Sequence, residues 1–386
     1  MSSTVFFQLK KVFKSNLTLI SISVLAFITL GLYFMVSNSL NSDTSLEGSI
    51  QGNIKIQKSI LAQGEKELKK YSPGSKNYQA KQKDVKNLKN KVQANLDLIT
   101  DIKHNNWRPV YKKQLASFTK LNGTNLSYQE KYQTEAFKKR FAYLKEHPMP
   151  YESDAPVTGV QALLTFNTDF WPLLFSLIIM FILAYLYTDS YRNKLDIDSV
   201  TPQSPLQRLL ASSAAGFTTS IIIFCLVSLF LFLIASLLYG PGNIQYPYII
   251  FHSIHQKFVS DVVPTSSLLF KNFIVQIFSF LFIALFVQLV AKLVRQQLPT
   301  LLIVLFLMIG GSLATTFIEP LSRIAAWLPS TYLGVLKVVS GQMANELNNP
   351  GINFNQGIVT LTVGTLLLIM ILLLMDQLQK QRTGAN

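Results

Sequence analysis

The sequence has few charged residues and a single cysteine. Charged residues make up 14% of the 386 positions, against roughly a quarter in ordinary soluble domains, while 49% are hydrophobic. This composition argues against a soluble globular protein and predicts a membrane protein. The one cysteine, Cys225, lies in an apolar run, so no disulfide can form within the chain. Any polar domain must therefore be stabilised by packing.

The sequence also lacks the motifs that usually carry nucleotide or metal chemistry. It contains no Gly-x4-Gly-Lys-Ser/Thr motif, whose backbone amides would cradle the phosphates of ATP. No His-Glu-x-x-His motif or cysteine pair accompanies its four histidines. His252 and His255 could share a helical face, but the nearby Tyr246 and Tyr248 favour an interfacial role over a metal site. We therefore expect no catalytic residues, no metal and no cofactor in this chain.

The net charge of +15 would suit nucleic acid, but the distribution of the charges does not. Within residues 37–168, Lys and Arg outnumber Asp and Glu by 21 to 12. The remaining basic residues cluster beside the ends of hydrophobic runs, as in the cytoplasmic segments of membrane proteins. We expect membrane lipid as a partner, and no nucleic acid.

Six hydrophobic runs are long enough to cross a bilayer as helices. They cover residues 17–36, 170–187, 211–239, 273–294, 298–318 and 358–375. Basic residues precede the first run and follow the last, so both termini are expected in the cytoplasm. The first run is too long for a cleaved signal peptide, and no small-x-small cleavage site follows it closely. The predicted fold class is an all-α polytopic protein of the plasma membrane, with bacteria as the expected source.

The polar segment between the first two runs, residues 37–168, is predicted to be a large helical extracytoplasmic domain. Apolar residues at steps of three and four indicate helices over about 46–71 and 76–103. A Ser-Pro-Gly-Ser turn joins them, which predicts an antiparallel coiled-coil hairpin. Another helix is expected over about 127–146.

Four segments beside the runs have distinct characters. Residues 1–16 combine apolar residues with lysines and predict an amphipathic helix on the inner membrane surface. Residues 188–210 form a polar loop that is expected to face the cytoplasm. Residues 240–271 and 319–350 are too polar to span the membrane and too apolar for free loops. We expect these two segments to be half-buried on the outer side.

Two sets of residues are expected to have structural roles. Ser212, Gly216 and Ser220 lie four residues apart and predict a small-residue seam that lets another helix approach closely. Glu319 and Arg323, also four apart, predict an ion pair at the outer end of the fifth run.

Other polar residues within or beside the runs are few. Asp169 is expected to cap the second span, and Gln276 and Gln288 are expected to hydrogen-bond with neighbouring helices. A proton or ion relay would need more buried carboxylates than the runs contain. This scarcity argues against a secondary transporter.

Several features together carry a resemblance to a known family. They are an amphipathic N-terminal segment (FFQLKKVFKSNL), a large insert after the first span, six spans in all, an inner loop with a proline before the third span (LDIDSVTPQSPLQRLL), and half-buried external helices before the sixth (PSTYLGVLKVVSG). With this layout the chain resembles the permease subunits of ABC transporters of the type-2 exporter class. The large Lys-rich external domain departs from the simplest members.

The resemblance implies a transporter subunit rather than an enzyme. A separate ABC ATPase would bind ATP and Mg, and a second permease half, identical or homologous, would complete the pathway. The cargo would be an amphipathic peptide, a lipid or a component of the cell envelope, moved outward. Carried over to this sequence, the ATPase contact would involve Leu195, Asp196, Ile197, Asp198, Val200 and Pro202 of the inner loop, and Phe6, Phe7, Lys10 and Lys11 of the N-terminal helix.

Two other functions stay open on the sequence alone. A mechanotransmission or sensor subunit would use ATP hydrolysis to move its external domain without transporting cargo, although that class has four spans rather than six. A membrane-bound scaffold or enzyme with an external active site is less favoured, because no catalytic motif occurs.

Overall fold

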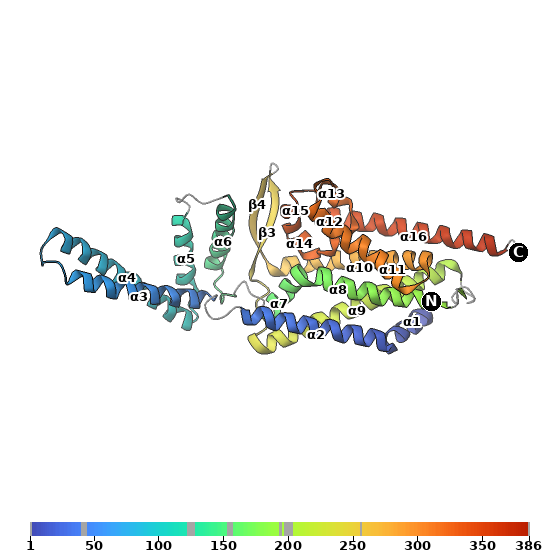
Figure 1. Cartoon of the computed structure of the whole chain (residues 1–386), viewed down its shortest axis with the longest axis horizontal. Helices are drawn as coiled ribbons and strands as arrows, with labels where there is room; N and C mark the ends of the chain where they lie inside the picture. The colour runs from blue at the N-terminus through green and yellow to red at the C-terminus, as the bar shows by residue number, and fades with distance from the viewer. Residues whose placement is uncertain are drawn as a thin grey trace.

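The computed structural model describes residues 2–39, 45–121, 128–152, 157–192, 195–196, 204–254 and 257–384. The molecule is elongated and mostly helical (Figure 1). Helix α1 (Ser2–Lys14) and the far end of α16 (Phe354–Gly384) lie at one end, which we call the proximal end. The opposite end, which carries α3–α6 and a β-hairpin, is the distal end.

Six helices in the described part of the chain are long and apolar enough to cross a membrane, which confirms the prediction of a multi-pass membrane protein. They are α2 (Asn16–Ser39), α7–η2–α8 (Gly159–Thr165, Phe166–Phe170, Trp171–Thr188), α9 (Pro205–Tyr239), α10 (Thr265–Val294), α11–η4–α12 (Gln297–Leu305, Phe306–Gly310, Gly311–Phe317) and α16.

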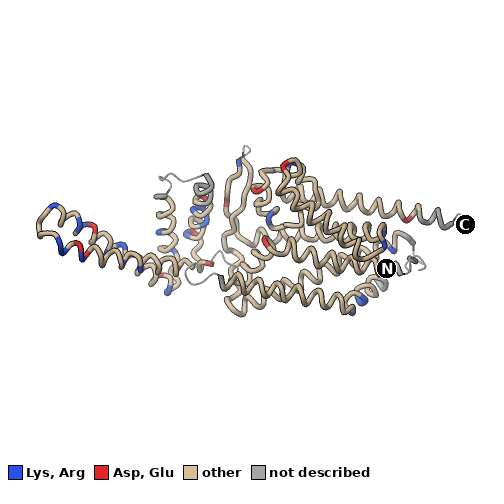
Figure 2. The backbone as a smooth tube through the Cα atoms, viewed as in Figure 1, with Lys and Arg blue, Asp and Glu red and all other residues tan. Residues whose placement is uncertain are grey.

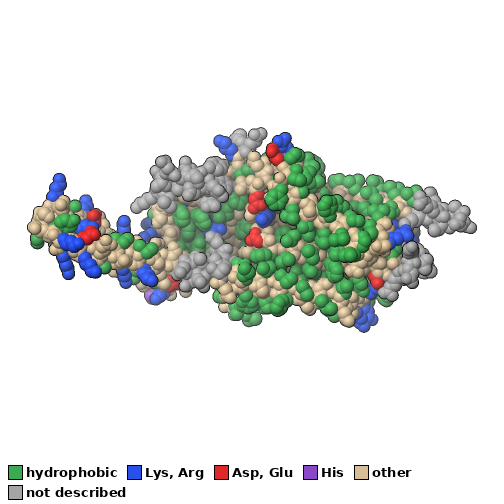
Figure 3. All heavy atoms as spheres, in the orientation of Figure 1, with side chains coloured by type: hydrophobic (Ala, Val, Ile, Leu, Met, Phe, Trp, Pro, Cys, Tyr) green, Lys and Arg blue, Asp and Glu red, His purple; other side chains and the backbone are tan. Residues whose placement is uncertain are grey.

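The six helices run side by side, and α8 and α10 lie at their centre. About half of each of these two spans is buried, a larger share than in the other four. Met180, Leu183 and Val287 are among the fully buried core residues. Apolar side chains cover much of the visible surface of the bundle, whereas Lys and Arg are frequent on the α3–α4 hairpin, on α6 and at the proximal end (Figures 2 and 3). This distribution suits a bundle surrounded by lipid.

The second span begins at Gly159, well before the predicted start at residue 170. Its first turn is capped by Thr158, whose hydroxyl accepts the backbone N–H of Gln161. The prediction that Asp169 caps this span is therefore wrong, because Asp169 lies inside the helix, in the π-helical turn η2. Pro172 follows this turn, and its missing N–H and bulky ring disfavour regular α-helical bonding just before it.

The distal end carries two helical pairs. Helices α3 (Leu46–Leu68) and α4 (Lys76–Lys103) form an antiparallel hairpin, and Ser45 and Ser75 cap their first turns. Their bounds lie close to the predicted ranges. The second pair is α5 (Trp107–Leu121) and α6 (Tyr128–Glu146). The sequence pattern did not predict α5, although its Pro109 lies in the first turn, where a proline is tolerated.

A β-hairpin occupies much of the segment expected to be half-buried before the fourth span. Strands β3 (Pro247–Ile254) and β4 (Lys257–Pro264) pair antiparallel, with Tyr248 opposite Val263. Aromatic and β-branched residues dominate both strands, which favours a pleated, half-buried surface. Helix α6 packs along this hairpin, and the Lys139 ammonium donates a hydrogen bond to the carbonyl of Ser260. The distal helices are thus attached to the bundle through this hairpin.

Short helices fill the segment between the fifth and sixth spans. They are α13 (Glu319–Ile324), η5 (Ala325–Trp327), η6 (Pro329–Leu333), α14 (Val335–Val339) and α15 (Gln342–Glu346). Tyr332 is fully buried, and its hydroxyl donates to the carbonyl of Ala326. Gly341 joins α14 to α15 at a φ of 73°, and a Cβ there would lie 1.9 Å from the carbonyl oxygen of Phe251. Only glycine allows β3 to approach this turn so closely.

Candidate functional site

Helix α1 presents an aromatic surface at the proximal end. It packs against α9 and α2, and its Val12 is buried in the core. Phe6 and Phe7, by contrast, are 68% and 66% exposed, and Lys10 is also exposed. Such an amphipathic helix can lie on a membrane surface or receive a partner protein. The residues predicted for the N-terminal part of the ATPase contact therefore share one accessible helix.

An ion pair ties α1 to the end of α8. The Lys11 ammonium contacts the carboxylate of Asp189, which is the C-cap residue of α8 and lies at the beginning of the polar loop 188–210. The Asp189 side chain is largely buried, whereas Lys11 is exposed. Because the loop begins at this residue, a force applied to α1 or to the loop would reach the same end of α8.

The polar loop 188–210 is described in part. Strands β1 (Tyr191–Arg192) and β2 (Leu195–Asp196) form a short antiparallel pair, so the backbone of Leu195 and Asp196 lies directly beside the end of α8. Arg295 lies in the turn between α10 and α11. Its guanidinium carbon lies over the Tyr191 ring, 5.7 Å from the centroid of that ring. The other predicted loop contacts, Ile197, Asp198, Val200 and Pro202, lie outside the described residues.

A buried ion pair lies further inside the proximal part of the bundle. Lys292 of α10 contacts the carboxylate of Asp376 of α16, and their side chains are only 10% and 16% exposed. One turn away, the hydroxyl of Ser213 hydrogen-bonds with the amide oxygen of Gln288 over 2.7 Å, which joins α9 to α10. A small cavity of about 70 Å³ adjoins these groups. The polar cluster therefore connects three spans in a low-dielectric environment.

Asp376 was not among the residues singled out from the sequence. The signal that could have found it is its position directly after the last apolar run, within reach of the helix that spans the membrane, since ionisable residues within spans are costly unless paired.

The predicted small-residue seam lies against α8. A Cβ at Gly216 would be 1.9 Å from the hydroxyl oxygen of Tyr187, so the Tyr187 side chain occupies the space above this glycine. The same hydroxyl lies 3.5 Å from the carbonyl oxygen of Ser212. Ser220 is buried and bonds within its own helix, to the carbonyl of Gly216. At the other end of the bundle, Arg323 and Glu319 form an exposed ion pair of 2.8 Å.

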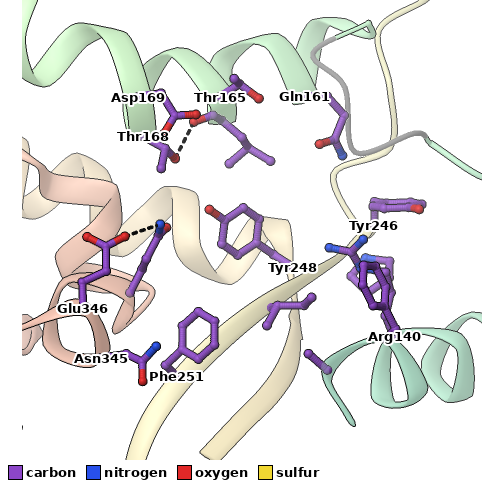
Figure 4. Close-up of a pocket in the computed structure, with 16 residues that line it drawn as sticks. Arg140, Gln161, Thr165, Thr168, Asp169, Tyr246, Tyr248, Phe251, Asn345 and Glu346 are labelled. Atoms are coloured by element: carbon purple, nitrogen blue, oxygen red, sulfur yellow. Dashed lines mark hydrogen bonds between the residues drawn. The ribbon is translucent and has the colours of Figure 1, made fainter. Parts of the chain in front are cut away.

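A cavity of about 580 Å³ lies at the distal end, between the distal helices and the bundle. Its walls come from α6, from α7 and η2, from β3 and from α15 (Figure 4). Apolar and aromatic side chains form much of the lining, including Leu164, Tyr248 and Phe251. Burial raises the pKa of the Tyr248 hydroxyl above its ordinary value, so this phenol stays neutral. Cavities of this size and character are typical of ligand sites in proteins.

Charged side chains enter this cavity from opposite sides. The π-helical turn η2 carries Asp169, and α15 carries Glu346, which accepts a hydrogen bond of 2.8 Å from Gln342. Arg140 enters from α6 on the far side, with its guanidinium 5.6 Å from the centroid of the Phe137 ring. The cavity thus combines an acidic side, a basic side and an aromatic middle.

A buried carboxylate fastens the wall beside the cavity. Glu152 accepts hydrogen bonds from the backbone N–H of Asn243, from the Gln161 amide over 3.1 Å and from the Thr158 hydroxyl over 3.3 Å. The Tyr246 hydroxyl donates to the backbone carbonyl of Glu152 over 2.8 Å. Burial raises the pKa of the Glu152 carboxyl, and the hydrogen bonds oppose this shift in part. Glu152 therefore joins the segment 147–152, the start of α7 and the approach to β3.

Comparison of the chain with models of protein families, with curated proteins and with solved structures finds no match in any of the three.

Proposed function

We propose that this chain is the permease subunit of an ABC exporter in the plasma membrane, driven by a separate ATPase that binds its proximal end. Both termini would lie in the cytoplasm and the distal end outside. The cargo would be an amphipathic peptide, a lipid or a component of the cell envelope. The observation that carries this proposal is the pairing of Lys11 with Asp189, which joins the amphipathic helix to the beginning of the inner loop.

The position of α8 supports a mechanical link between the two ends. This helix is largely buried at the centre of the bundle, begins near the distal cavity and ends at the Lys11–Asp189 pair. A buried helix moves as a unit, because close-packed neighbours transmit displacement rather than absorb it. A partner that binds two states of the proximal end unequally would therefore also shift the state of the distal end.

A second permease half would cover an apolar face of the fifth span. Several large side chains of α11, η4 and α12 are exposed, among them Leu302, Phe306 and Phe317. A second copy or a homologous half could bury part of this face, and lipid would cover the rest.

The mechanotransmission function remains the second candidate, on a specific observation. The α3–α4 hairpin projects from the bundle (Figure 1), and its core is continuous with α5, α6 and Tyr246, which lies next to β3. Motion of the bundle would therefore reach the hairpin through packed side chains. In this case the moving part would be the hairpin itself.

Co-purification tests the exporter proposal. The tagged chain should retain a nucleotide-binding subunit when it is purified from its native membrane in a mild detergent. The double variant Phe6→Ala/Phe7→Ala should lose that subunit, because it removes the exposed aromatic surface of α1. Phe27→Ala is the matched control, since Phe27 is 77% exposed on α2 but lies outside the proposed contact. Reproducible absence of any ATPase from the wild-type preparation would refute the proposal.

A hairpin truncation separates the two candidates. Removing residues 62–88 and joining the ends by a short Gly-Ser turn shortens α3 and α4 but keeps Ile50, Ile54 and Val92 of their core. An exporter should keep cargo-stimulated ATPase activity after this deletion. A mechanotransmission subunit should keep basal ATPase activity but lose its external output.

A further inference from the structure

The distal cavity separates its charges in a way that suits a dipolar ligand. Figure 4 shows Asp169 and Glu346 on one side, Arg140 on the other, and the rings of Tyr248 and Phe251 between them. Arg140 would repel a purely cationic ligand, and the two carboxylates would repel a purely anionic one. A ligand with an ammonium and an anionic group some ångströms apart would match both sides.

The two carboxylates differ in how far they are already neutralised. Glu346 lies 3.7 Å from the ammonium of Lys337 and accepts a hydrogen bond from Gln342. Asp169, in contrast, makes no hydrogen bond and no ion pair with the residues that the structure describes, and the Lys337 ammonium acts on it only from a greater distance. Its side chain is exposed to the cavity. Asp169 is therefore the stronger site for a ligand cation.

The location of the cavity points to the class of ligand. The eighteen residues of α8 are almost all hydrophobic, and Asp169 is the first charged residue beyond the distal end of that helix. The cavity therefore lies at the depth of lipid headgroups if the bundle spans a bilayer. Tyrosine side chains such as Tyr246 and Tyr248 are typical of this layer.

We propose that the distal cavity binds the headgroup of a zwitterionic phospholipid with a primary ammonium. The ammonium would donate hydrogen bonds to Asp169 and Glu346, and the phosphate would accept them from the guanidinium of Arg140. The acyl chains would leave the cavity along the apolar surface of the bundle. Phosphatidylethanolamine has this chemistry. The site does not depend on an ATPase partner, so it stands or falls separately from the proposed function.

Lipid binding to the full chain in detergent tests this site directly. Dihexanoyl phosphatidylethanolamine, phosphatidylcholine and phosphatidylglycerol are titrated separately, and bound lipid is counted by native mass spectrometry. We expect phosphatidylethanolamine to bind at least tenfold more tightly than the other two. Equal binding of phosphatidylcholine would overturn the hydrogen-bonded ammonium, because its trimethylated nitrogen has no N–H to donate. Free phosphoethanolamine should compete only weakly, and competition equal to that of the lipid would overturn the lipid assignment.

Substitutions assign the two sides of the site. Asp169→Asn should weaken phosphatidylethanolamine about tenfold or more and leave phosphatidylglycerol unchanged, whereas Arg140→Gln should weaken both lipids. Asp261→Asn on β4 is the matched control, because Asp261 is exposed but does not line the cavity. Unchanged affinity in a folded Asp169→Asn protein would overturn the proposal.

A second variant keeps the test decisive if Asp169→Asn does not fold. Glu346→Gln lies on α15, outside the spans, and should weaken phosphatidylethanolamine by a smaller factor because Lys337 already offsets this carboxylate. An affinity equal to that of the wild type would then refute the acidic side of the site.

Discussion

The buried pair between Lys292 and Asp376 gives a prediction whose size follows from its surroundings. The two side chains are only 10% and 16% exposed and join α10 to α16. Removing one partner of a buried pair leaves an uncompensated charge, which costs about 3–5 kcal/mol. Because a small polar cavity adjoins the pair, we expect Asp376→Asn to cost about 3 kcal/mol, at the low end of that range.

A double-mutant cycle distinguishes the pair from two independent residues. Lys292→Met and Asp376→Leu are made singly and together: each single change leaves one buried charge unpaired, whereas the double variant removes both charges and should be nearly neutral, since hydrophobic residues often replace a buried pair without loss. Thermal unfolding in detergent measures the difference. At about 2 °C for each kcal/mol, Asp376→Asn should lower the midpoint by about 6 °C, while the double variant stays near the wild type.

An exposed pair in the same protein provides the control. Arg323 and Glu319 lie 2.8 Å apart, but their side chains are 76% and 78% exposed. Glu319→Gln should therefore leave the midpoint almost unchanged, as is usual for surface pairs. If the double variant at Lys292 and Asp376 lost as much stability as the sum of the single changes, the reasoning about charge burial would be refuted.

Three further predictions concern other close contacts. Gly216→Ala should destabilise the bundle by about 1–3 kcal/mol, because its Cβ would meet the buried hydroxyl of Tyr187 at 1.9 Å; Tyr187→Phe should restore part of the loss in thermal unfolding. Gly341→Ala should lower the unfolding midpoint and the resistance of β3 to proteolysis, since φ is 73° and the new Cβ would lie 1.9 Å from the carbonyl oxygen of Phe251; an unchanged protein would contradict the close packing. Burial raises the pKa of the Glu152 carboxyl above 4.5, so its protonated form contributes stability that is present below pH 4.5 and is lost as pH rises through the folded-state pKa. As pH rises from 4 to 7, the unfolding midpoint of the wild type should therefore fall relative to that of Glu152→Gln, which has no group to titrate at this position. A difference between the two midpoints that does not change with pH would contradict the raised pKa of Glu152.

The spans could be predicted from the sequence because hydropathy and length decide which segments can cross a bilayer. The exact start of the second span could not. Asp169 interrupts the apolar character of the chain, but the helix continues through it as a π-helical turn, and the cap at Thr158 lies eleven residues further back. The carboxylate of Asp169 therefore suggested that the span begins there, whereas in the structure the helix only widens at this turn and begins at Gly159.

The β-hairpin and the distal cavity show a different limit. The aromatic and β-branched residues around Tyr248 favour strands, but the same residues also suit an interfacial loop, and only pairing between β3 and β4 decides between the two. The cavity cannot be found by spacing at all, because Arg140, Asp169, Tyr248 and Glu346 are far apart in the sequence. Their meeting depends on how α6, η2, β3 and α15 pack.

Photo-crosslinking from helix α1 tests the central claim most directly. A photoreactive amino acid replaces Phe7 in one protein and Phe27 in a second, and each is irradiated in the native membrane. Both positions are exposed aromatic residues, but only Phe7 belongs to the proposed contact surface. A crosslink from position 7 to a nucleotide-binding protein, with none from position 27, is the predicted result. Position 7 crosslinked only to lipid, in membranes where position 27 behaves identically, would contradict the account.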